Sequence, residues 1–237
     1  MKNILCLAFL LICFSISAQN SVGTSLSNVD SIFSPKLTGE LYKPDTISSR
    51  GEQFFNGQWV ESSVLLSTGE KINGVKIKYN GFLDEVIWQN TSNFKQFQLD
   101  KSYISEFWLK NQMDSTIHFK RLNITDSTSR NPSGIFVEVA AEGTFSLYIQ
   151  HKVSHLVDEL VAYKYFVIYE KTPLYYIKLP SSLYFRLSEL NRKTFLNVFP
   201  EQKKTLSKMI RVNRLNLKTE KGLIRAIDLM NQNGLIN

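Results

Sequence analysis

Two histidines and a glutamate recur at intervals of four residues, at His151, His155 and Glu159. On an α-helix this spacing would place two imidazoles and a carboxylate on one face, an arrangement that binds zinc. The segment Leu147–Ile149 that leads into them has the composition of a strand, however, and a strand breaks that geometry. We therefore expect ordinary histidines at a strand end, without a metal. The third histidine, His118, has no partner nearby in the sequence.

Asp84 and Glu85 are the most conspicuous adjacent carboxylates. Paired carboxylates can perform acid–base catalysis, but adjacent residues of a strand point to opposite faces, so these two do not form a dyad. We expect them in a solvated turn. Serine nucleophile elbows, phosphate-binding glycine loops and zincin helices are absent from the sequence. The sequence therefore predicts no catalytic residue and no cofactor, although distant strands can still assemble a carboxylate site.

The basic charge is concentrated near the C-terminus. Residues 186–237 contain 11 basic and 4 acidic residues, whereas residues 19–185 contain 16 basic and 17 acidic residues. Because the basic helix lacks the interleaved aromatic residues of nucleic-acid grooves, we expect no nucleic-acid partner. A solvated helix face is the more common reason for such a charge run. If the face binds a partner, anionic lipid headgroups or lipopolysaccharide phosphates suit an exported protein. The candidate contacts are Lys203, Lys204, Lys208 and Arg211.

The N-terminus has the order of a secretory signal peptide. A short basic start precedes the apolar run Ile4–Phe14, and small residues follow up to Ala18. We expect cleavage after Ala18 and a periplasmic or cell-surface location. The apolar run is shorter than the roughly 20 residues that a transmembrane helix needs, so we expect no such segment in the mature chain.

Both cysteines, Cys6 and Cys13, lie inside this leader. The mature chain would contain no cysteine, which excludes disulfides, thiol catalysis and cysteine-based zinc sites. Lipidation at Cys13 is the alternative. Ile12 disfavours it, because lipoprotein signals carry a small residue at that position.

Short alternating segments from Phe54 to Leu109 predict a β-meander. Asn80-Gly81 separates Val75–Tyr79 from Val86–Trp88, and this dipeptide favours a two-residue type I′ hairpin turn. Val75, Ile77 and Tyr79 should share the buried face of their strand, because side chains alternate with a period of two. Further strands are predicted by the same alternation over 94–99, 103–109, 117–122, 135–140, 144–149, 163–169 and 174–179.

The C-terminal part changes to helical spacing after Pro180. Asn191 is expected to cap a short helix that ends before Pro200, and Thr219 to cap the last helix. Between them, residues 201–213 predict a helix with one apolar stripe. We expect these helices to pack on the sheet, because short amphipathic helices are not stable alone.

The sequence thus predicts a mainly β chain: an antiparallel meander forming a sandwich or barrel-like sheet, with two or three C-terminal α-helices. The expected division is a signal peptide (1–18), an irregular arm (19–51) with one edge strand near Ile32-Phe33, a β domain (52–180) and a basic helical segment (181–237).

The run Phe54–Val60, the strand ending Lys78-Tyr79-Asn80 and the acidic pair after it resemble a group of exported bacterial β-rich proteins of unknown function. The basic C-terminal helices resemble theirs also, whereas Ser62-Ser63 stands where that group carries glycine. The resemblance implies a β structure and an envelope location but no activity.

For function, the sequence favours a non-enzymatic binding or structural protein of the bacterial envelope. The alternative is a hydrolase of envelope polymers. The sequence does not predict the oligomeric state.

Overall fold

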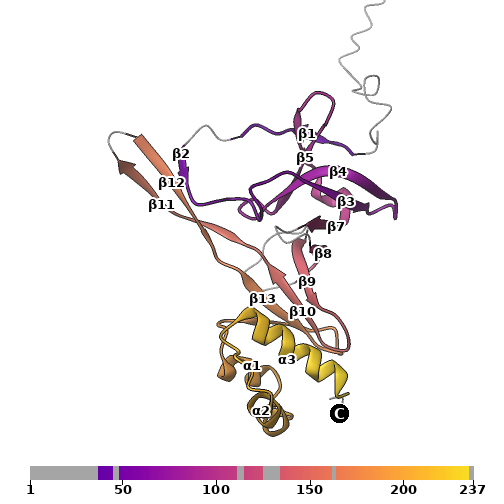
Figure 1. The fold of residues 1–237 in the computed structure, drawn as a ribbon, viewed down its shortest axis with the longest axis vertical. Helices are drawn as coiled ribbons and strands as arrows, with labels where there is room; N and C mark the ends of the chain where they lie inside the picture. The colour runs from indigo at the N-terminus through magenta and orange to yellow at the C-terminus, as the bar shows by residue number, and fades with distance from the viewer. Residues whose placement is uncertain (1–36, 45–47, 111–114, 125–133, 162–163, 235–237) are drawn as a thin grey trace, which may run out of the picture. The chain divides into compact units, whose positions relative to one another are not determined.

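The computed structural model describes residues 37–44, 48–110, 115–124, 134–161 and 164–234 (Figure 1). The chain divides into residues 1–35 and 36–237, and all of the described residues belong to the second unit. The predicted leader with Cys13, and the edge strand expected near Ile32-Phe33, lie outside the described residues.

The described elements follow one another along the chain as β1 (Gly39–Leu41), β2 (Ser48–Arg50), β3 (Val60–Leu66), β4 (Lys71–Asn80), β5 (Glu85–Gln89), β6 (Gln96–Leu99), the 3-10 turn η1 (Lys101–Tyr103), β7 (Ile104–Lys110), β8 (Thr116–Leu122), β9 (Ile135–Ala141), β10 (Ser146–Gln150), β11 (Val153–Val161), β12 (Lys164–Lys171), β13 (Leu174–Lys178), β14 (Tyr184–Leu187), α1 (Arg192–Val198), α2 (Lys203–Val212) and α3 (Glu220–Gln232).

Eleven strands form one antiparallel sheet in the order β1-β6-β5-β4-β3-β7-β8-β9-β10-β13-β14. The other three form a small sheet, β11-β12-β2, in which β2 runs parallel to β12. The hairpin β11–β12 continues β10 and β13 away from the large sheet (Figure 1). The predicted mainly β fold with C-terminal helices is confirmed. The alternation in the sequence did not predict strands β1, β2 and β14, and it did not predict that β11 is a full strand.

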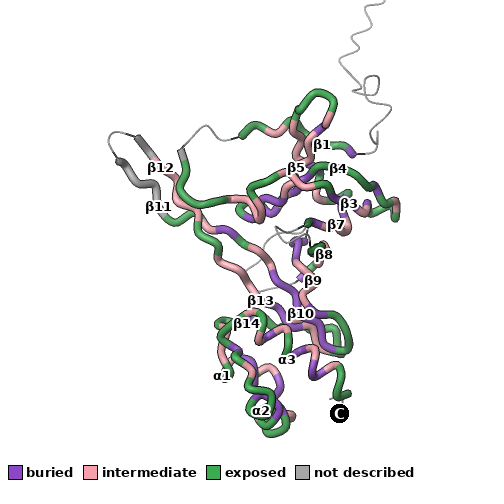
Figure 2. Tube along the Cα trace, viewed as in Figure 1, coloured by how far each residue is buried: buried purple, intermediate pink, exposed green. Residues whose placement is uncertain are grey.

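Strand β4 shows why the sheet forms as predicted. Val75, Ile77 and Tyr79 are buried, whereas Lys76 is exposed and Lys78 is half-buried (Figure 2). The period of two in the sequence is therefore the period of burial in the strand.

The large sheet curls, so that β4 faces β9. Four inter-strand steps separate these strands, which would be about 19 Å in a flat sheet. The rings of Tyr79 and Phe136 nevertheless lie 6.2 Å apart, and Tyr79 also contacts Phe107 and Phe119. These four aromatic residues lie together in the apolar core that the curl encloses.

The turn after β4 differs from the predicted type I′ hairpin, and that prediction is wrong. The connection is the four residues from Gly81 to Asp84, and positive φ occurs at Asp84 (58°) rather than at Asn80 and Gly81. The buried Asn80 uses Oδ1 to accept the N–H groups of Phe82 and Leu83, at 3.0 and 3.1 Å.

A glycine is required at position 81 because the backbone of the turn lies in close contact with the backbone near His151. The Gly81 N–H donates to the Gln53 carbonyl at 2.9 Å, and the Gly81 carbonyl accepts the Val153 N–H at 3.0 Å. A Cβ at this position would lie 2.3 Å from the carbonyl oxygen of His151. The turn is thus held against the junction of β10 and β11.

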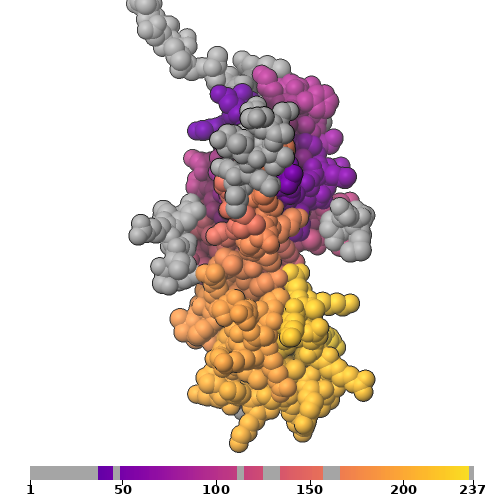
Figure 3. Space-filling view, turned by 90° about the vertical axis from the view of Figure 1, so that its left-hand side faces the viewer, coloured from indigo at the N-terminus to yellow at the C-terminus, as the bar shows by residue number. Residues whose placement is uncertain are grey.

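Helix α1 packs on β14, α3 packs on β9 and β10, and α2 packs on α1 (Figure 1). All three contribute to one apolar core with the sheet, and Figure 3 shows the helical residues gathered at one end of the molecule. Asn191 and Thr219 accept N–H groups at the starts of α1 and α3, so both predicted caps are confirmed. Asn231 of α3 clamps Phe145 next to β10, accepting its N–H and donating to its carbonyl at 2.9 Å each. None of the helices in the described residues has the length and apolar character needed to cross a membrane.

Candidate functional site

A groove of about 450 Å³ lies between α1 and α2. Five of its six lining residues are cationic, and none is acidic. The ion pairs that the structure shows among the described residues involve other side chains. The groove is therefore a region of uncompensated positive charge, which attracts anions. Its lining residues are Arg192, Lys203, Lys204, Ser207, Lys208 and Arg211.

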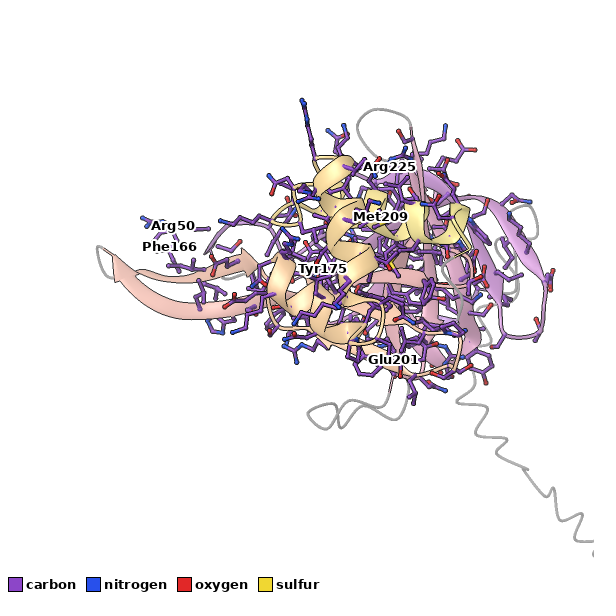
Figure 4. The ribbon with its side chains drawn as sticks, turned by 90° about the horizontal axis from the view of Figure 1, so that it is seen from below. Arg50, Phe166, Tyr175, Glu201, Met209 and Arg225 are labelled. Atoms are coloured by element: carbon purple, nitrogen blue, oxygen red, sulfur yellow. The ribbon has the colours of Figure 1, made fainter. Side chains whose placement is uncertain are left out.

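Helix α2 positions four of these cations by its amphipathic pattern. Leu206, Met209 and Ile210 are buried in the core shared with the sheet, and Figure 4 shows Met209 within the helical layer. The opposite side of α2 is exposed and carries the cations. The structure thus brings together all four cations of α2 that the sequence had singled out.

Arg192 is the functional candidate that the sequence analysis missed. It is the first residue of α1, directly after the Asn191 cap, and its Nη2 donates to the Ser207 carbonyl of α2 at 3.3 Å. This contact directs the guanidinium into the groove. The only signal for it in the sequence is the cap at Asn191, which fixes where α1 begins.

The start of α2 adds to the positive potential. Gln202 makes no side-chain cap, and the first turn contains Lys203 and Lys204 without an acidic residue. The N-terminal end of a helix dipole is already positive, so cations there are unfavourable. Helix α3 shows the usual arrangement, with Thr219 as its cap and Glu220 in the first turn.

Asp84 occupies a second polar site, and the predicted solvated turn is wrong for it. The residue is only 8% exposed. Its carboxylate accepts the Tyr79 hydroxyl at 2.7 Å, the Phe136 N–H at 3.2 Å and the Lys101 ammonium at 2.5 Å. Burial raises the pKa of Asp84, and the Lys101 charge opposes that rise. The cluster ties the β4–β5 turn to η1 and β9 and is structural.

A cleft of about 450 Å³ adjoins this cluster, between β1, β6 and the β4–β5 turn. Glu40, Glu85, Asp100 and Lys101 are its charged lining residues. Burial raises the pKa of Glu85, whereas hydrogen bonds from the side chain and the N–H of Ser102 lower the pKa of Asp100. Carboxyl groups with diverging pKa values are the basis of acid and base roles in one site.

The three histidines do not assemble into one site. His118 pairs with Glu106 at 2.7 Å, and His151 pairs with Glu138 at 2.5 Å. His155 lies in β11, so the helical stack with Glu159 does not form. Within the described part of the chain, no group of three His, Cys, Asp or Glu side chains is arranged to hold a metal.

No protein-family model, curated protein or solved structure matches the chain. The resemblance to exported β-rich proteins therefore assigns no family, and the function has to be argued from the site itself.

Proposed function

We propose that this protein is an exported, non-enzymatic binding protein of the bacterial cell envelope, and that the α1–α2 groove holds it against an anionic surface. One observation carries the proposal: five cations from two helices line a single groove that contains no carboxylate. The expected leader would deliver the protein to a compartment where anionic lipids and lipopolysaccharide phosphates are the abundant polyanions.

The mode of binding is electrostatic rather than insertion into the lipid. The apolar stripe of α2 is already packed in the core, through Leu206, Met209 and Ile210. Apart from the exposed Val212 at its last turn, α2 presents mainly its cations for contact with a membrane. Binding should therefore depend on anionic lipid and weaken as salt screens the charges.

Vesicle co-sedimentation tests the proposal. We expect binding to phosphatidylcholine vesicles that contain phosphatidylglycerol, and loss of binding at high salt or on pure phosphatidylcholine. Each cation near an anionic surface contributes about 1 kcal/mol, so replacing Lys203, Lys204 and Lys208 by serine should weaken binding about a hundredfold.

A matched triple variant controls for net charge. Lys76, Lys95 and Lys152 are exposed residues outside the groove, and their replacement by serine removes the same three charges. It should bind nearly as well as the wild type. Both variants should remain folded, because all six lysines lie on the surface. Equal binding to neutral vesicles, or an equal loss in both variants, would contradict the proposal.

The second candidate function is hydrolysis of an envelope polymer in the cleft at Glu85. Its support is that Glu85 and Asp100 line one cleft and that their pKa values are shifted in opposite directions, upward for Glu85 and downward for Asp100. The test is release of soluble fragments from purified envelope glycan. Glu85→Gln should abolish the release if this function is correct, whereas Glu142→Gln, at an exposed position outside the cleft, should not.

A further inference from the structure

The residues that line the α1–α2 groove carry more hydrogen-bond donors than acceptors. A guanidinium has five N–H donors, and one donor of Arg192 goes to the Ser207 carbonyl. The other residues that line this groove are Lys203, Lys204, Ser207, Lys208 and Arg211. Among the side chains that line the groove, many donors thus face a single acceptor, the Ser207 hydroxyl.

The same cations repel one another along α2. Lys204 and Lys208 are four residues apart, and Arg211 follows three residues later, so all three lie on neighbouring turns of one face. Like charges at this spacing destabilise a helix. Lys203 and Lys204 also oppose the helix dipole. An anion that accepts several hydrogen bonds at once would relieve both effects.

We propose that this groove is a discrete site for a phosphate monoester group. The inference rests on the proposed function in one respect, because it names the chemical group by which the anionic surface is recognised. A monoester carries about −1.5 to −2 charge at neutral pH and has three acceptor oxygens, whereas a phosphodiester carries a single charge. The excess of donors from two helices matches the monoester. It can belong to a lipid headgroup or to a soluble compound.

Vesicles of equal surface charge separate this site from general attraction to anions. One set contains phosphatidic acid, a monoester, and the other contains enough phosphatidylglycerol, a diester, to match its zeta potential. The wild type should bind the phosphatidic acid vesicles about tenfold more tightly, because the additional charge-assisted hydrogen bonds form only with the monoester.

Arg192→Gln and Arg225→Gln form a matched pair of variants. Both remove one guanidinium from an exposed position of the helical layer, but Arg225 lies on α3 and does not line the groove (Figure 4). Arg192→Gln should abolish the preference for phosphatidic acid, and Arg225→Gln should keep it. Calorimetry with glycerol 3-phosphate, the soluble headgroup, identifies the source: saturable binding that Arg192→Gln removes indicates a soluble ligand, and binding to vesicles alone indicates the lipid.

The outcomes separate the two proposals. Equal binding to the charge-matched vesicles, with no binding of glycerol 3-phosphate, would overturn the monoester site and leave the envelope-binding function intact. An equal effect of the two arginine variants would also overturn the site. Binding of glycerol 3-phosphate without binding to any vesicle would support the site and contradict the proposed membrane function.

Discussion

Gly81→Ala tests whether the β4–β5 turn is held against the β10–β11 junction by close backbone contact. The added Cβ would lie 2.3 Å from the His151 carbonyl oxygen and 3.0 Å from Cγ2 of Val153. Non-bonded heavy atoms prefer about 3.5 Å, so the two backbones must separate by about 1 Å. Overpacking of this kind costs about 1–3 kcal/mol.

The separation also strains the two hydrogen bonds of Gly81, with the Gln53 carbonyl and the Val153 N–H. Each contributes about 1 kcal/mol to stability, so the total loss in the free energy of unfolding should be about 2–4 kcal/mol. Urea denaturation measures this loss. Hydrogen exchange of the Val153 amide should accelerate in the variant, because its acceptor is the carbonyl of residue 81.

Gly57→Ala is the matched control. The atoms nearest to its added Cβ would be those of the Glu52 carboxylate, the end of an exposed side chain that can move away. We expect a change within about 0.5 kcal/mol, or a small gain from the stiffer unfolded chain. If Gly81→Ala and Gly57→Ala have the same stability, the close contact does not hold the turn and the reasoning is wrong.

Three further predictions concern the buried polar contacts. Lys101→Met should raise the pKa of Asp84 further, because it removes the largest influence that opposes burial. A carboxyl group whose folded pKa exceeds its unfolded value loses stability as pH rises from the unfolded pKa, near 3.8 for Asp84, up to the folded pKa, and the loss is complete above it. This variant should therefore be more destabilised, relative to the wild type, at pH 8 than at pH 4, by about 1.4 kcal/mol per unit of added pKa shift. Chemical denaturation at both pH values, with the exposed Lys95→Met as control, tests the sign. Tyr79→Phe should cost about 1.5–3 kcal/mol in the same assay, because the buried hydroxyl donates to a charged acceptor; a loss below about 0.5 kcal/mol would mean that this bond is weak. Asn231→Ala leaves the N–H and the carbonyl of Phe145 without their partner and should lower the thermal midpoint, with a loss of about 2 kcal/mol; an unchanged midpoint would show that water replaces the clamp.

Much of the β fold could be predicted from the sequence, because alternation along a half-buried strand is a local property. The spacing of Val75, Ile77 and Tyr79 predicts the buried face of β4, and this prediction needs no information about any other strand. The helix caps at Asn191 and Thr219 are equally local. The curl of the sheet is not local, since it depends on contacts such as that between Tyr79 and Phe136.

The polar sites also divide into those that local spacing predicts and those that depend on contacts between distant parts of the chain. The four cations of α2 share a helix face, so their spacing alone brings them together. Arg192 joins them only through the packing of α1 on α2. Asp84 appeared solvated because two of its three partners are distant in the sequence: Lys101 is 17 residues away and Phe136 is 52 residues away. A strand pattern does not reveal which turn residue will meet them.

Fractionation of the cells that make this protein, followed by a salt wash of the envelope, tests the central claim most directly. We predict that the protein sediments with the envelope and that high salt releases it. The mass of the released chain should correspond to the sequence without residues 1–18. The Lys203, Lys204 and Lys208 triple variant should instead be found in the soluble exported fraction. A chain that stays in the cytosol with its leader intact, or one that salt does not release, would contradict the account.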